Sequence, residues 1–127
     1  MKKVILIISI LKTVITILAI KYFVSFRYLI KFLEKKRLSN QNFYDQNEIR
    51  LALNSVFTKF NIDNCLTSSS VIYVVLTKNG FKSKLSIGFH GTNKDFHSHS
   101  WVEYENNIYH TNPIDLKQIK KLIEIAP

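Results

Sequence analysis

The residues best suited to covalent chemistry in this sequence are its single cysteine, Cys65, and a histidine further along the chain, His99. A cysteine thiolate attacks carbonyl carbons, and a nearby imidazole can take the thiol proton and later give it to a leaving amine. A cysteine followed by a histidine is a weak pattern by itself, because a lone cysteine is more often a small buried hydrophobic residue. Catalysis and simple burial therefore both stay open at this level.

A helix is expected to begin at Cys65. Asn64 is a good N-cap, the next residues are apolar or small on most sides, and Asn79-Gly80 is a typical C-terminal stop. The N-terminus of a helix carries partial positive charge and free N–H groups. These groups lower the pKa of a cysteine thiol and can stabilise an oxyanion, so the position suits a nucleophile.

Alternation with period two predicts an antiparallel sheet in the second half of the chain. The expected strands cover residues 85–89, 97–104 and 108–110, with a hairpin turn at 105–107. The second strand places His99 on one face with His97, Trp101 and Glu103. A helix followed by this sheet brings a histidine-bearing strand toward the cysteine-bearing helix.

A third polar group normally fixes the ring of a catalytic histidine. Its candidates lie on and after the third strand: His110, Thr111, Asn112 and Asp115. We prefer Asn112, because its amide oxygen can accept a hydrogen bond from the ring N–H. The sequence has neither a glycine-rich phosphate loop nor a second cysteine, and we expect no cofactor and no metal.

The remaining elements complete an α+β layout. Asp45 and Glu48 form a capping-box pattern before a helix that ends near Asn61, and residues 36–44 are a polar linker. Leu116, Ile119 and Ile123 predict a short C-terminal helix. We divide the chain into an apolar, basic helical segment, residues 1–40, and a folded domain, residues 41–127.

Composition and charge limit the classes of partner. The chain has 127 residues, 46% of them hydrophobic, which supports one folded core, and its free thiol fits a reducing cytoplasm. The net charge is +9, yet residues 1–40 hold nine Lys or Arg and one acid, whereas the remainder is nearly balanced. This asymmetry argues against a nucleic-acid-binding domain and suits a membrane surface or a partner that meets the N-terminal segment.

Residues 4–33 are strongly apolar and allow three interpretations. One or two amphipathic helices, with Ser9, Lys12, Thr13 and Thr16 as a polar stripe, fit best. A transmembrane helix fits in length, but a lysine near a bilayer centre costs roughly 3 kcal/mol. A secretory signal fits worst, because Lys12 interrupts the apolar region.

Several motifs in order resemble the leader peptidases of lasso-peptide biosynthesis, the C-terminal domain family of microcin-processing proteins. These motifs are Cys65-Leu66 at a helix start, Leu85-Ser86-Ile87-Gly88 in a strand, and Phe96-His97-Ser98-His99-Ser100-Trp101-Val102-Glu103. The family carries alanines where this chain has Ser98 and Ser100. The resemblance implies a transglutaminase-like or papain-like cysteine peptidase core, with Cys65 on a central helix packed on a small antiparallel sheet.

The resemblance also implies roles and partners. Cys65 matches the family nucleophile and His99 the family base, whereas the aspartate of several relatives falls near Thr111, which is not an acid. The implied reaction removes the leader from a ribosomally made precursor peptide. A separate small recognition protein holding the leader and an ATP-dependent lasso cyclase are the implied partners. An acyl transferase or deamidase of the same class, and a non-catalytic membrane-associated interaction module, are the alternatives.

Overall fold

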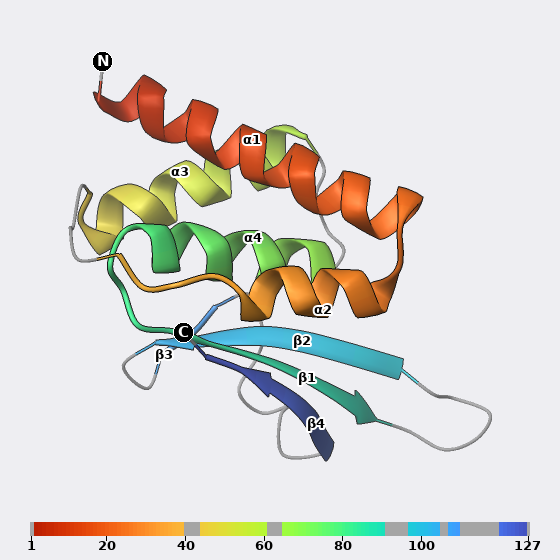
Figure 1. Ribbon diagram of the computed structural model, residues 1–127. Helices are drawn as coiled ribbons and strands as arrows, with labels where there is room; N and C mark the ends of the chain where they lie inside the picture. Colours follow the sequence, from red (N-terminus) through yellow and green to blue (C-terminus); the bar gives the residue numbers. More distant parts are fainter. Residues whose placement is uncertain are drawn as a thin grey trace.

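Helices cover one face of an antiparallel sheet (Figure 1). The structure is a computed structural model and describes residues 2–39, 44–60, 65–90, 97–104, 107–109 and 120–126. Its helices are α1 (Lys2–Phe23), α2 (Phe26–Glu34), α3 (Gln46–Lys59) and α4 (Cys65–Lys78). Its strands are β1 (Lys84–His90), β2 (His97–Tyr104), β3 (Asn107–Tyr109) and β4 (Lys120–Ile125).

The apolar N-terminal stretch forms two helices that pack on the rest of the chain. Ser25 separates them, and its Oγ accepts a hydrogen bond from the Tyr28 N–H (3.2 Å), which caps the start of α2. The expected polar stripe is only partly right, because Thr13 is buried. The Thr13 hydroxyl donates to the carbonyl oxygen of Ser9 (3.0 Å), so burial leaves this donor satisfied.

The predicted starts and stops of α3 and α4 are largely confirmed. Asp45 and Glu48 form the capping box, with the Glu48 N–H donating to Asp45 Oδ1 (2.7 Å). Helix α4 begins at Cys65 as expected, although the proposed N-cap Asn64 lies outside the described residues. Beyond α4, Gly80 adopts a φ of 82°, a conformation that favours glycine and stops a helix.

The sheet has the order β3-β2-β1-β4, and every neighbouring pair is antiparallel. The strands expected over residues 85–89 and 97–104 are confirmed, as is the third strand at residues 108 and 109. The predicted C-terminal helix is wrong over residues 120–125, which form β4 against β1. A helix would have left one edge of β1 without backbone partners, whereas a strand supplies them.

The pairing of β1 with β4 contains a local irregularity. Ile87 pairs with Ile123 and Gly88 with Lys121, so β4 carries one extra residue at this point. Such a bulge increases the local twist of a strand.

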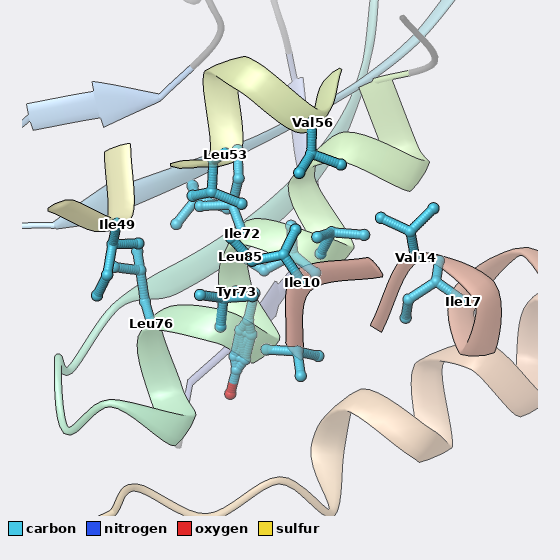
Figure 2. Close-up of a cluster of buried hydrophobic side chains, with 14 of the residues drawn as sticks. Ile10, Val14, Ile17, Ile49, Leu53, Val56, Ile72, Tyr73, Leu76 and Leu85 are labelled. Carbon is cyan, nitrogen blue, oxygen red and sulfur yellow. The ribbon is translucent and has the colours of Figure 1, made fainter. Parts of the chain in front are cut away.

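One hydrophobic cluster joins the helices and the sheet (Figure 2). Its labelled members come from α1, α3, α4 and β1: Ile10, Val14, Ile17, Ile49, Leu53, Val56, Ile72, Tyr73, Leu76 and Leu85. The segment before residue 40 therefore contributes to the same core as the segment after it. The division of the chain into residues 1–40 and 41–127 stays a sequence prediction.

Candidate active site

Cys65 is the first residue of α4, the most deeply enclosed helix of the described structure. Residues 67–77 of α4 are all buried, and several are small hydroxyl residues that allow neighbours to approach closely. The helix packs on α1, α3, β1 and β2. The helix dipole of α4 therefore runs along a buried axis that ends at Cys65.

His99 lies within β2, where it pairs with Gly88 of β1. Helix α4 packs on β2, and the two elements run in the same direction (Figure 1). The end of α4 that carries Cys65 and the end of β2 that carries His97 and His99 consequently lie toward the same end of the molecule. The structure thus packs the helix that begins at Cys65 on the strand that contains His99.

The residues expected to orient the histidine lie outside the described part of the chain. This group comprises Asn112, the preferred choice, and the alternatives His110, Thr111 and Asp115. Residues 105 and 106 of the hairpin turn predicted at 105–107 lie outside it as well, whereas Asn107 is the first residue of β3. The assignment of Asn112 as the third member stays a prediction.

Trp101 and Glu103 of β2 are linked directly to each other. The Trp101 indole Nε1–H donates to Glu103 Oε1 (2.8 Å), and the Trp101 side chain is only 3% exposed. Both residues share one face of the strand, as the alternation predicted, whereas Val102 belongs to the hydrophobic cluster and Tyr104 packs against it. This bond pairs the indole donor and fixes a buried ring two residues beyond His99.

Ser100, between His99 and Trp101, is buried with a hydroxyl that has no partner. Its side chain is 4% exposed, and Ser100 Oγ makes no hydrogen bond in the structure as described. Ser100 pairs with Ile87, and both belong to strands that pack on α4. A small residue suits a strand that packs on a helix, and a buried hydroxyl without a hydrogen-bond partner lowers stability.

One polar contact at the first turn of α4 has no signature in the sequence. The Lys21 ammonium donates to Thr67 Oγ1 (3.4 Å), which joins the C-terminal end of α1 to the N-terminal turn of α4. The two residues are 46 positions apart, so no local pattern could have paired them. A cation at the positive end of a helix favours a nearby anion such as a thiolate.

Among the described residues, no group of three or more His, Cys, Asp or Glu side chains could hold a metal ion. The described parts of the candidate site are the N-terminus of α4, the strand β2 and Lys21. This set suits acyl chemistry on a thiol.

The described structure thus has a central helix that begins at Cys65 and packs on an antiparallel sheet. Comparison with protein-family profiles matches residues 23–124 to the transglutaminase-like superfamily, and the chain belongs to that superfamily. The match includes Cys65, His99 and Asn112 but not Lys21. The superfamily includes cysteine peptidases and acyltransferases. Comparisons with curated proteins and with solved structures give no significant match.

Proposed function

We propose that the protein is a cysteine peptidase that removes the leader from a lasso-peptide precursor through a thioester on Cys65. The observation that carries this proposal is the placement of Cys65 at the start of α4 together with the packing of α4 on the His99 strand. Membership of the transglutaminase-like superfamily supports thiol chemistry. The motif Phe96–Glu103 supports leader removal, by its resemblance to the lasso leader peptidases.

The proposed reaction has two steps. His99 takes the proton of the Cys65 thiol, the sulfur attacks the carbonyl carbon of the scissile peptide bond, and backbone N–H groups of α4 stabilise the oxyanion. The C–N bond then breaks, His99 protonates the leaving amine, and the leader remains bound as a thioester. Water, deprotonated by His99, attacks the thioester carbonyl and releases the leader carboxylate and the free thiol.

The proposal includes a papain-like role for Asn112. The amide oxygen of Asn112 accepts the His99 ring N–H and holds the imidazole in the productive tautomer, as the third member of such sites does. Alanine substitution of Asn112, compared with substitution of Thr111 and of Asp115, identifies the orienting residue. Replacement of the orienting residue lowers kcat far more than it raises KM, because the orientation of His99 acts on the transition state.

The proposed partners follow from the same resemblance. A separate small protein holds the leader, and an ATP-dependent cyclase closes the ring on the core peptide that this chain releases. The reducing cytoplasm, where a lone thiol stays free, is the proposed compartment. Acyl transfer or deamidation is the second candidate, because the superfamily also includes acyltransferases.

The test combines the full chain with precursor and recognition protein and follows the products by mass spectrometry. We expect the wild type to cut the precursor into leader and core, and Cys65→Ala and His99→Gln to leave it whole. His97→Gln, two residues earlier in β2, is the matched control and should retain cleavage. Cleavage by Cys65→Ala at the wild-type rate refutes the proposal, and an uncut precursor with a modified side chain favours transfer or deamidation.

The thiol itself offers a check that needs no substrate. A catalytic Cys65 reacts with an alkylating agent at a pH well below the ordinary thiol pKa of about 8.5. An alkylation profile of Cys65 centred on that ordinary pKa favours a non-catalytic interaction module with the same fold.

A further inference from the structure

Helix α1 is apolar on two opposite faces, of which only one is buried by the protein. The inner face lies in the hydrophobic cluster against α3 and α4 and comprises Leu6, Ile10, Val14, Ile17 and Ile20. The outer face is exposed and comprises Val4, Ile5, Ile8, Ile15 and Ala19, with the polar residues Lys12 and Thr16 among them. A surface helix of a soluble domain normally carries polar residues outward, so this outer face lacks the partner that its composition requires.

We propose that the outer face of α1 docks the folded protein on the surface of an anionic lipid bilayer, with α1 parallel to the membrane. The helix has 22 residues, so the docking strip is about 33 Å long. Figure 1 places α1 on the side of the helical layer away from the sheet, where a planar surface can meet it along its length. The proposal does not depend on the chemistry of Cys65.

Spanning is the first alternative, because α1 is the one helix of the described structure that is long and apolar enough to cross a bilayer. Its inner face argues against spanning. Withdrawal of α1 into lipid would expose to water the buried apolar side chains of α3 and α4 that the inner face now covers, because α1 packs on both helices. A helix α1 that lies in the interface between water and bilayer keeps its inner face in the protein core and its outer face in lipid.

The positive charge of the N-terminal helices indicates that the lipid is anionic. Residues 4–39 carry seven Lys or Arg and a single acid, Glu34. Four of these basic side chains are exposed on α2 or just after it, namely Arg27, Lys31, Lys35 and Arg37. A basic side chain near an anionic leaflet strengthens binding to that leaflet. Lys12 can extend its ammonium toward the headgroups while its methylenes stay among the aliphatic side chains.

Exposed aromatic side chains gather at the corner between α1 and α2. Phe23 is 87% exposed and Tyr22 73%, and Tyr28 at the start of α2 is also exposed. Aromatic rings flanked by basic residues are typical of the boundary between headgroups and acyl chains. A protein partner fits less well, because the centres of protein interfaces are depleted of lysine and Lys12 stands in the middle of the strip.

Docking would also orient the candidate active site. The hydrogen bond from Lys21 to Thr67 ties the aromatic corner to the first turn of α4. The corner and the Cys65 end of α4 lie toward the same end of the molecule (Figure 1). A bilayer that receives the corner therefore lies toward the same end of the molecule as the first turn of α4.

The test is sedimentation of the full chain with lipid vesicles. One set contains phosphatidylcholine alone and the other an equimolar mixture of phosphatidylcholine and phosphatidylglycerol. We expect at least tenfold tighter binding to the mixed vesicles, loosened by salt. The double variant Ile8→Ser/Ile15→Ser should lose at least tenfold in affinity yet keep the wild-type melting temperature, because both side chains are exposed.

Charge variants provide the matched control. Lys12→Glu on the outer face should weaken binding to the mixed vesicles, whereas Lys82→Glu, exposed just before β1 in the sheet layer, should weaken it less. Failure of the wild type to bind mixed vesicles overturns the proposal, as does undiminished binding by the double variant. Retention on the vesicles after washing at high salt and alkaline pH also overturns it, because that result indicates a spanning helix.

Discussion

Replacing Ser100 by alanine should make the protein more stable. The Ser100 hydroxyl is buried, its side chain is 4% exposed, and it has no hydrogen-bond partner in the described structure. A buried hydroxyl without a partner costs about 1–3 kcal/mol, and removal of one oxygen leaves only a small void that offsets part of the gain. We expect a net gain of about 1 kcal/mol, which raises the melting temperature by about 3–5 °C for a domain of this size.

Urea unfolding followed by circular dichroism measures this gain, with the fluorescence of Trp101 as a second probe, because Trp101 is the single tryptophan. Ser25→Ala is the matched control of opposite sign. Ser25 Oγ accepts the Tyr28 N–H at the start of α2, so its loss should cost about 1 kcal/mol. A hydrogen bond usually contributes about 1 kcal/mol to stability. If the Ser100→Ala variant is less stable than the wild type by that amount or more, the hydroxyl has a hydrogen-bond partner and the reasoning is refuted.

Three further predictions test the core and the electrostatics of the site. Lys21→Met should shift the alkylation profile of Cys65 to higher pH, whereas Lys21→Arg, which keeps the charge, should not; equal profiles contradict this prediction. Burial raises the pKa of Tyr73 above its ordinary value of 10.0, so the folded state holds the phenol proton more tightly. The stability that this proton contributes is complete below about pH 10 and is lost as the pH rises through the raised pKa of Tyr73. In urea unfolding at alkaline pH, the Tyr73→Phe variant should therefore lose less stability with rising pH than the wild type. Ile17→Ala should cost about 3 kcal/mol in the same unfolding assay, whereas Ile15→Ala, 66% exposed on the other face of α1, should change stability by less than about 0.5 kcal/mol; similar costs would mean that α1 does not pack as described.

Local patterns predicted the elements that local interactions specify. The Asp45–Glu48 capping box and the glycine stop at Gly80 act within a few residues, and both appear as expected. The alternation in β1 and β2 also appears, because each strand has one face in the hydrophobic cluster. The position of Cys65 at a helix start follows from the same kind of signal.

Features that depend on distant parts of the chain could not be predicted. The helical spacing of Leu116, Ile119 and Ile123 competed with a strand, and the unpaired edge of β1 decided the outcome over residues 120–125. The hydrogen bond from Lys21 to Thr67 joins residues from separate helices. For the candidate site, the sequence identified the helix and the strand that the structure packs together, and the orienting role of Asn112 stays a prediction.

The extra residue in β4 has a consequence for the geometry of the site. The irregularity falls between Ile87 and Gly88, and Gly88 is the residue of β1 that pairs with His99. Because a bulge bends its strand and increases the local twist, the extra residue in β4 affects the angle at which β2 passes the start of α4. An insertion or deletion in β4 should therefore change the geometry between the strand of His99 and the helix of Cys65, the two elements on which the proposed reaction depends.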